Sequence, residues 1–305
     1  MYDVIIIGSG PAGLSAAVYG KRAGLKLMVV EKQPMSGGQI LNTYEVDNYL
    51  GLPGMNGFDM GMKFREHADR MEIEFLEAEV SAIRVEGESK KVVTDAGEYE
   101  CRTVIYAAGA EHAKLGIPGE EKLTGMGVSY CATCDGAFFK NRTVAVVGGG
   151  DVAVEDAIFL ARGCEKVYLV HRRDELRAAD ILQKKLFSLP NVEVLWSHVA
   201  EAILGEEMTE AIQLKDVKTG EEKRIPVSGV FIAVGILPQS GLLEGLAERD
   251  ERGYVVAGED CVTSADGIFA AGDCRRKNLR QIITAVADGA NAATSAWNFL
   301  NRSES

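Results

Sequence analysis

Two stretches of the chain repeat one pattern of apolar and glycine positions. In the first, an apolar strand is predicted over Asp3 to Ile7, followed by a glycine-rich turn and an apolar helix from roughly Leu14 to Arg22. A second apolar strand is predicted over Lys26 to Val30 and ends at Glu31. Strand, turn, helix and strand in this order are typical of a βαβ unit in a parallel sheet.

The first turn reads Gly8-Ser-Gly10-Pro-Ala-Gly13, which is the G-x-G-x-x-G pattern in its required context. Its first glycine allows the tight turn, its second lets the backbone approach a pyrophosphate, and its third packs the helix on the strand. The helix N-terminus attracts the anion, and Pro11 suits the first helical turn. Glu31 can accept hydrogen bonds from ribose hydroxyls. This segment therefore predicts a dinucleotide site.

The second stretch repeats the plan with a strand over Thr143 to Val147 and the turn Gly148-Gly-Gly150-Asp-Val-Ala153. A helix to about Arg162 and a strand over Lys166 to Val170 follow. Ala153 replaces the third glycine. The chain thus predicts two dinucleotide-binding modules.

His171 stands at the same spacing from its turn as Glu31 does in the first module, and Arg172, Arg173 and Arg177 follow it. A carboxylate would repel an adenosine 2′-phosphate, whereas guanidinium groups bind it through charge-assisted hydrogen bonds. We therefore expect the second module to prefer NADPH to NADH. The alternative for the arginines is a solvated helix face.

Between the two modules lies the close cysteine pair Cys131 and Cys134, followed by Asp135. A dithiol beside two dinucleotide sites indicates electron transfer through a disulfide. Half of a zinc site or an inert structural link are the alternatives, but zinc needs four ligands and the histidines are scattered. Asp135, if partly buried, suits a general acid that protonates a departing thiolate; otherwise it caps a helix or is a surface acid. The other cysteines, interpreted as ordinary thiols, are Cys101, Cys164, Cys261 and Cys274.

A third marker, Gly267-Ile-Phe-Ala-Ala-Gly-Asp273, is a short apolar strand and turn far beyond the second module. If it completes the first nucleotide site, the second module is inserted into the first domain, with crossings near Gly109 to Pro118 and Val234 to Ser240. Glu74 to Val104 is predicted to form a small sheet that caps the first domain. The expected fold class is α/β, with one domain formed by residues 1–113 and 242–305 and the inserted domain by residues 114–241.

The composition limits the partners and the cellular compartment that we expect for the protein. The chain has 305 residues and a formal net charge of −12, which argues against a nucleic-acid surface. It opens directly on a strand, without a secretory signal, and no apolar run reaches spanning length. Six cysteines with one close pair do not resemble a secreted disulfide framework. A cytoplasmic protein that binds no membrane is expected.

Together these motifs resemble the low-molecular-weight bacterial thioredoxin reductases of the pyridine nucleotide-disulfide oxidoreductase family. The resemblance covers essentially the whole chain, with two small departures: Pro238-Gln-Ser240 where Pro-Asn-Thr is common, and Asp156 where a second Glu is common. The motifs that carry it are Gly8 to Gly13, Gly37-Gly-Gln39, Cys131-Ala-Thr-Cys134-Asp135, Gly148 to Ala153, His171-Arg-Arg173 with Arg177, Ala271-Gly-Asp273 and Arg280-Gln281.

The resemblance implies two Rossmann-like domains of the three-layer ββα type, FAD in the first and NADPH in the second, inserted one. It implies that Cys131 attacks oxidised thioredoxin, that Cys134 faces the flavin, and that the chain forms a homodimer. The implied FAD-binding residues are Gly8, Gly10, Pro11, Ala12, Gly13, Glu31, Gly38, Gln39, Asn48, Val80, Ala108, Gly109, Gly272, Asp273, Arg280, Gln281 and Ile282. The implied NADPH-binding residues are Gly148, Gly150, Asp151, Val152, Ala153, Glu155, His171, Arg172, Arg173, Arg177 and Gly235.

Two other functions remain open at this point. One is an NADPH-dependent reductase of another acceptor, such as a glutaredoxin-like protein or a low-molecular-weight disulfide. The other is a flavin-bound redox sensor without turnover, which would need no intact NADPH site. The inserted domain is expected to rotate about its two linkers, presenting nicotinamide and disulfide to the flavin in turn. Phe138 and Phe139 are either an apolar docking patch or part of the core.

Overall fold

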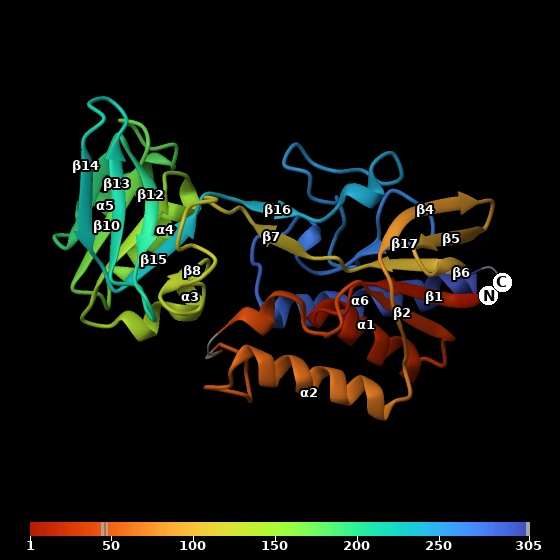
Figure 1. The fold of residues 1–305 in the computed structure, drawn as a ribbon. Helices are drawn as coiled ribbons and strands as arrows, with labels where there is room; N and C mark the ends of the chain where they lie inside the picture. Colours follow the sequence, from red (N-terminus) through yellow and green to blue (C-terminus); the bar gives the residue numbers. More distant parts are fainter. Residues whose placement is uncertain (44–45, 47, 303–305) are drawn as a thin grey trace. The chain divides into compact units, whose positions relative to one another are not determined.

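The computed structural model describes residues 1–43, 46 and 48–302. The chain divides into two compact units (Figure 1). Unit 1 consists of residues 1–41, 49–111 and 237–305, and unit 2 of residues 42–48 and 112–236. The main segment of unit 2 is therefore inserted between two parts of unit 1 in the sequence.

Unit 1 contains a parallel sheet of the expected nucleotide-binding kind. Its strands are β1 (Tyr2–Ile7), β2 (Leu27–Glu31), β3 (Glu74–Glu77), β6 (Gly97–Tyr106) and β17 (Ile268–Ala270). They pair in the order β3-β2-β1-β6, and β17 lies parallel to β6. The apolar runs predicted as strands are thus the central strands, buried on both faces.

The segment Glu74 to Val104 does not form the separate capping sheet predicted from its alternating pattern. β4 (Val80–Glu86) and β5 (Ser89–Thr94) extend the central sheet as an antiparallel meander on β6. The reason is the length of β6. Its first half pairs with β5, while its second half pairs with β1 and β17, so one strand belongs to both parts.

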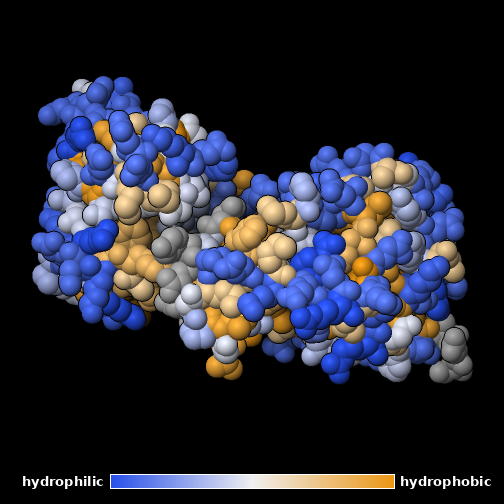
Figure 2. Space-filling model, turned by 60° about the horizontal axis from the view of Figure 1, so that its bottom comes forward, coloured by the Kyte–Doolittle hydropathy of each residue, from blue (hydrophilic) through white to orange (hydrophobic). Residues whose placement is uncertain are grey.

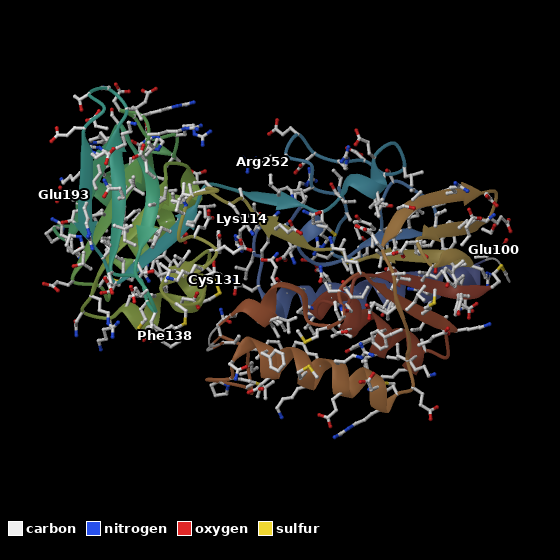
Figure 3. The ribbon with its side chains drawn as sticks, viewed as in Figure 1. Glu100, Lys114, Cys131, Phe138, Glu193 and Arg252 are labelled. Carbon is white, nitrogen blue, oxygen red and sulfur yellow. A yellow bond between two sulfur atoms is a disulfide. The ribbon has the colours of Figure 1, made fainter. Side chains whose placement is uncertain are left out.

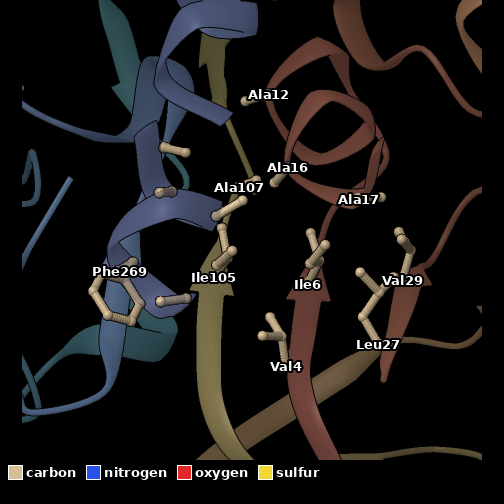
Figure 4. Packing of buried hydrophobic residues seen from close by; sticks show 14 of the residues in the cluster. Val4, Ile6, Ala12, Ala16, Ala17, Leu27, Val29, Ile105, Ala107 and Phe269 are labelled. Carbon is tan, nitrogen blue, oxygen red and sulfur yellow. The ribbon is translucent and has the colours of Figure 1, made fainter. Parts of the chain in front are cut away.

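Helices α1 (Pro11–Arg22), α2 (Gly57–Arg70) and α6 (Ile282–Arg302) complete unit 1, with the short helices η1 (Gly38–Asn42), η3 (Gly241–Leu243) and η4 (Gly272–Cys274). Ala12, Ala16 and Ala17 of α1 pack on strand side chains such as Ile6 and Ile105 (Figure 4). These small residues let the helix lie close to the sheet.

Unit 2 contains a second parallel sheet in the order β11-β10-β9-β15-β8. Its strands are β8 (Val128–Ser129), β9 (Thr143–Gly148), β10 (Lys166–His171), β11 (Val192–Trp196) and β15 (Gly229–Ala233). The two-residue strand β8 lies at the edge of this sheet and leads into the cysteine pair.

The two faces of this sheet are covered differently. Helices α4 (Asp151–Leu160) and α5 (Asp180–Phe187) contribute to one buried apolar cluster. A three-stranded antiparallel sheet of β12 (His198–Leu204), β13 (Ala211–Asp216) and β14 (Glu222–Pro226) contributes to the other. Helix, parallel sheet and antiparallel sheet make the three-layer ββα arrangement, which confirms the expected fold class.

The chain passes between the units along two short strands, β7 (Ala110–His112) and β16 (Ile236–Pro238), which pair as a two-stranded sheet. At one end the Ala113 N–H donates to the Gly235 carbonyl at 2.9 Å. At the other the Gln239 N–H donates to the Gly109 carbonyl at 3.0 Å. Entry and exit of the inserted segment are therefore adjacent.

Hydrophilic side chains cover most of the face seen in Figure 2, with apolar side chains in smaller patches between them. Among the helices of the described residues, none has the length and apolar character needed to cross a membrane.

Candidate functional site

Cys131 and Cys134 form a disulfide, with 5.3 Å between their Cα atoms. Cys131 is the N-cap of α3 (Ala132–Asp135), a single turn that follows β8 and continues into η2 (Gly136–Phe139). Both cysteines are partly exposed, and Figure 3 shows Cys131 and Phe138 on this segment. The Thr133 hydroxyl lies 3.4 Å from the Cys131 sulfur.

Asp135 is hydrogen-bonded on one side only. The Ser129 hydroxyl donates to its Oδ2 at 2.5 Å, whereas Oδ1 is buried without a hydrogen-bond partner in the described part of the chain. Burial raises the pKa of Asp135 above its ordinary value, and the hydrogen bond from Ser129 offsets part of that rise. Asp135 is thus a partly buried acid rather than a surface one, and its side chain makes no cap.

The two phenylalanines after the pair have different surroundings. Phe139 is buried in the core, edge-on to the Phe231 ring at 5.2 Å between centroids. Phe138 is only partly buried and packs against the same cluster. Core packing is therefore the outcome for Phe139, which takes no part in a docking patch.

A carboxylate ties the segment before the cysteines to the start of unit 2. Glu120 accepts hydrogen bonds from the Leu115, Gly116 and Ile117 N–H groups and from the Tyr130 hydroxyl, the last at 2.7 Å. Burial alone would raise the pKa of Glu120, but these hydrogen bonds outweigh it and lower the pKa.

The glycine turn of unit 1 depends on close backbone approaches. Gly8 has a φ of 102°, in the region that favours glycine. A Cβ at Gly13 would lie 1.9 Å from the Gly8 carbonyl oxygen, so only glycine lets α1 start against the strand. Gly10 is the N-cap of α1 and no side chain caps the helix, which leaves its first N–H groups available to an anion.

Other segments predicted for this site converge on the turn. Glu31 at the end of β2 accepts hydrogen bonds from the Ser9 N–H at 2.7 Å and the Ser9 hydroxyl at 2.9 Å. The Gly37 N–H donates to the Ser9 carbonyl at 2.9 Å. A Cβ at Gly272 would lie 2.9 Å from the Ala12 side chain. Two distant parts of the sequence, residues 31–37 and the turn at Gly272, thus border the glycine turn.

Two polar atoms among the predicted residues are buried without a hydrogen-bond partner in the described chain, Arg280 Nε and Asp273 Oδ1. Asp273 Oδ1 lies 3.1 Å from Lys277 Nζ, as an ion pair without hydrogen-bond geometry. The Arg280 guanidinium lies over the Tyr254 ring at 4.0 Å. Unsatisfied buried polar atoms and an uncapped helix N-terminus, both present in unit 1, are what a site for a polar, phosphorylated ligand presents.

The turn of unit 2 has the same features. Gly150 is the N-cap of α4, no side chain caps that helix, and a Cβ at Gly150 would meet nothing within 4 Å. Asp151 in the first turn accepts a hydrogen bond from the Ala179 N–H at 2.8 Å, which ties the helix to the segment after the arginines. Ala153 is fully buried at the position of the third glycine.

His171 is buried, whereas the arginines that follow it in the sequence are exposed. The His171 ring is buried, with Nδ1 3.1 Å from the Gly148 carbonyl and Nε2 2.9 Å from the Glu175 carbonyl. Burial lowers the pKa of His171, and a neutral ring can donate to only one of these oxygens. Arg172, Arg173 and Arg177 are exposed, and within the described residues their side chains form no ion pair.

Comparison with known proteins settles the family. The profile of the family described as Pyridine nucleotide-disulphide oxidoreductase matches residues 2–289. The chain belongs to this family. It is 46% identical over 302 residues to a thioredoxin reductase of Bacillus subtilis (strain 168), covering 98% of this chain and 95% of the relative.

Two solved structures extend the comparison. A thioredoxin reductase from Streptococcus pyogenes MGAS5005 matches with a TM-score of 0.94 and 43% identity, covering 99% of both chains. A ferredoxin-flavin thioredoxin reductase from Clostridium acetobutylicum matches with a TM-score of 0.54 and 34% identity, covering 99% of this chain and 98% of that one. This member of the pyridine nucleotide-disulphide oxidoreductases is of the low-molecular-weight thioredoxin reductase type.

The structure brings many of the predicted residues together and leaves others apart. Glu155 and Val152 are exposed on α4, Asn48 is exposed, and Val80 begins β4. Gly235 has a φ of 139° beside the second crossing. Sequence reasoning missed Ser9, Glu120, Ser129 and Asp288, which act through hydrogen bonds to the turns. Only Ser9 and Ser129 carried a signal, because each adjoins a motif.

The residues present fit the cofactors of the family. The glycine turn with Glu31, Asp273 and Arg280 offers N–H groups, an acid for ribose and buried polar atoms suited to FAD. The second turn, with exposed arginines behind it, suits the 2′-phosphate of NADPH. The chain is an NADPH-dependent flavin disulfide oxidoreductase.

Proposed function

We propose that the protein reduces oxidised thioredoxin, passing electrons from NADPH through FAD and the Cys131–Cys134 disulfide. The observation that supports this most is the pairing of a partly exposed disulfide with a partly buried acid, Asp135, in a chain carrying two uncapped nucleotide turns. The chain matches thioredoxin reductases of Bacillus subtilis and Streptococcus pyogenes over nearly their full lengths. A glutaredoxin-like acceptor, a small disulfide and a sensor without turnover are not favoured.

Each of the two domains binds one of the two cofactors in this proposal. We assign FAD to the domain of residues 1–113 and 242–305, and NADPH to the inserted domain of residues 114–241. The predicted binding residues keep the roles given to them in each domain. His171 differs from the other residues of this set in how it acts. Its buried ring holds the Gly148 turn and the loop at Glu175 in place, while the exposed arginines bind the phosphate. When bound, FAD supplies hydride acceptance from NADPH and two-electron transfer to the disulfide.

The cysteines carry the exchange with thioredoxin. The Cys131 thiolate attacks the partner disulfide, and the departing thiolate takes the proton of Asp135. Cys134 then gives its proton to the Asp135 carboxylate and attacks the Cys131 sulfur. This restores the Cys131–Cys134 disulfide and releases the second thiolate, which takes a proton from water. Two electrons leave the dithiol, and Asp135 ends as it began.

The cellular location and the oligomeric state follow from the same proposal. The remaining cysteines are buried free thiols, which suits a reducing cytoplasm. A homodimer follows from the resemblance to the thioredoxin reductases. The net charge of −12 argues against nucleic acid as a partner, and we propose no membrane partner. The inserted domain is expected to rotate about its two linkers during turnover.

A panel of disulfide acceptors with NADPH and NADH side by side tests the function. Steady NADPH oxidation with thioredoxin is expected, far faster than with glutaredoxin-like proteins or small disulfides. Cys131→Ser should stop it and leave the flavin bound. Anaerobic addition of excess NADPH should release new free thiols; a flavin that bleaches without them contradicts the proposed route.

A further inference from the structure

Ser129 is the residue of unit 2 that links the acid to the cysteine pair. It ends β8, where Ser129 pairs with Phe231 of β15, and it is buried. Because Ser129 lies in a sheet, its backbone is held in place by the neighbouring strand. Asp135 and Cys131, in contrast, lie on a short helical turn. The fixed group is therefore Ser129, and the acid is held to it.

The Ser129 oxygen has three polar neighbours, all within hydrogen-bond distance. It accepts from the Cys131 N–H at 3.0 Å. It can donate its single hydrogen either to Asp135 Oδ2 at 2.5 Å or to the Cys131 carbonyl at 3.3 Å. One hydrogen cannot serve both acceptors at once, so the choice depends on what Asp135 offers.

The protonation state of Asp135 decides that choice. When the carboxyl is ionised it is an acceptor only, and the Ser129 hydroxyl donates to it. When Oδ2 carries a proton, it donates to the Ser129 oxygen, and the Ser129 hydrogen turns to the Cys131 carbonyl. The other oxygen of Asp135 has no hydrogen-bond partner in the described residues, so Ser129 is the contact that distinguishes the two states.

We propose that Ser129 is a positioning residue for the disulfide exchange: its hydroxyl holds Asp135 beside the cysteine turn and reverses its hydrogen bond as Asp135 gives up and regains its proton. The inference deepens the proposed function and rests on it. It gives Ser129 a role in how readily the acid releases its proton, in addition to holding the turn.

Ser129 is the main polar group that affects the pKa of Asp135. Helix α4 packs against α3 and carries Asp151, Glu155 and Asp156, while η2 carries no titratable side chain. Burial and the Ser129 hydrogen bond are the causes of the shifted pKa of Asp135. The thiols of Cys131 and Cys134 would titrate in the reduced protein, so the oxidised holoprotein is the form to measure.

The test follows the carboxyl group of Asp135 by its infrared C=O band during a pH titration of the oxidised holoprotein, with Asp135→Asn as the blank. Without the hydroxyl the ionised form loses its donor. Ser129→Ala should therefore move the titration midpoint upward by about one pH unit. Ser129→Thr, which keeps a hydroxyl on a strand residue, should return the midpoint close to that of the original protein.

The pH profile of thioredoxin reduction supplies the second readout. Its alkaline limb should move upward with Ser129→Ala, and the same substitution should leave the profile unchanged in an Asp135→Asn background. An unchanged carboxyl midpoint in Ser129→Ala overturns the inference even if thioredoxin is reduced. A shifted midpoint in a protein that does not reduce thioredoxin overturns the proposed function and leaves the link between Ser129 and Asp135 standing. If Ser129→Ala fails to fold, an unshifted midpoint in Ser129→Gly decides against the inference and a raised one supports it.

Discussion

Arg275 and Asp288 form a two-point ion pair inside unit 1, with Nε 2.9 Å from Oδ2 and Nη2 2.6 Å from Oδ1. Both side chains are buried, at 9% and 5% exposure. Asp288 Oδ2 also lies 3.1 Å from Lys277 Nζ and accepts the Gly272 N–H at 3.0 Å. One carboxylate on α6 therefore pairs with two cations and holds the turn that contains Asp273.

Asp288→Asn should destabilise unit 1 strongly, because it leaves the Arg275 guanidinium buried without its carboxylate partner and leaves Lys277 paired with Asp273 alone. We expect the free energy of unfolding to fall by about 3–5 kcal/mol, with FAD lost more easily on dilution. Denaturant unfolding followed by flavin fluorescence measures both effects. Glu66→Gln, which breaks an exposed pair with Arg70, is the control and should change stability by less than about 0.5 kcal/mol. Equal effects of the two substitutions would refute this.

The third position of the two glycine turns should respond to exchange for different physical reasons and to different extents. Gly13→Ala places a Cβ against the Gly8 carbonyl, and we expect a loss of about 1–3 kcal/mol together with weakened FAD binding. Ala153→Gly in unit 2 removes only a buried methyl within a helix and should cost about 1 kcal/mol. Calorimetry and flavin content check the pair, and a Gly13→Ala variant that keeps full flavin would contradict the packing argument.

Cofactor preference should depend on the exposed arginines. The double substitution Arg172→Gln/Arg177→Gln removes two of the three candidate charge-assisted partners of the 2′-phosphate. The KM for NADPH should rise about 10- to 100-fold, from about 1.5–3 kcal/mol of lost binding, while the KM for NADH changes little. Arg224→Gln, on exposed β14, is the control for net charge. An unchanged KM for NADPH would show that the arginines only form a solvated surface, and a parallel rise with both nucleotides would show that they do not select the 2′-phosphate.

Asp156 on α4 predicts a pH-dependent stability. Burial, with a smaller effect from the charge of Glu155, raises the pKa of Asp156 to about 7. Between pH about 4 and 7 the folded protein therefore holds a proton that the unfolded chain has lost, and stability falls as pH rises through this window. Asp156→Asn should flatten the fall, with a gain on the order of 1–2 kcal/mol at pH 8 because the side chain is partly exposed.

Urea unfolding at pH 5 and pH 8 measures this effect. Glu155→Gln should reproduce a minor share of it, since the Glu155 charge is the second cause of the shift. An Asp156→Asn variant with the same pH dependence as the original protein would show that Asp156 titrates normally.

The sequence predicted the elements that depend on local pattern. The strands and helices of both glycine modules were expected at nearly their observed bounds, because periodicity, glycines and an acid at a fixed spacing are local signals. The sheet containing β4 and β5 was expected to be separate, since nothing in the sequence shows that β6 pairs with different partners along its length. Asp288 escaped notice for a similar reason, because Gly272 and Arg275 lie outside its helix and only the fold brings them within hydrogen-bond distance. The partners of Glu120 are close to it in the sequence, but no motif marks them.

The hydrogen bond between Gly109 and Gln239 has a practical consequence for separating the molecule into its parts. Because the two cut points of unit 1 already touch, the inserted segment can be excised and the ends rejoined by a short peptide without stretching the host. A shortened protein of this kind would assign the flavin to one unit by colour alone. It also means that a single gene insertion at one site suffices to account for the two-module chain.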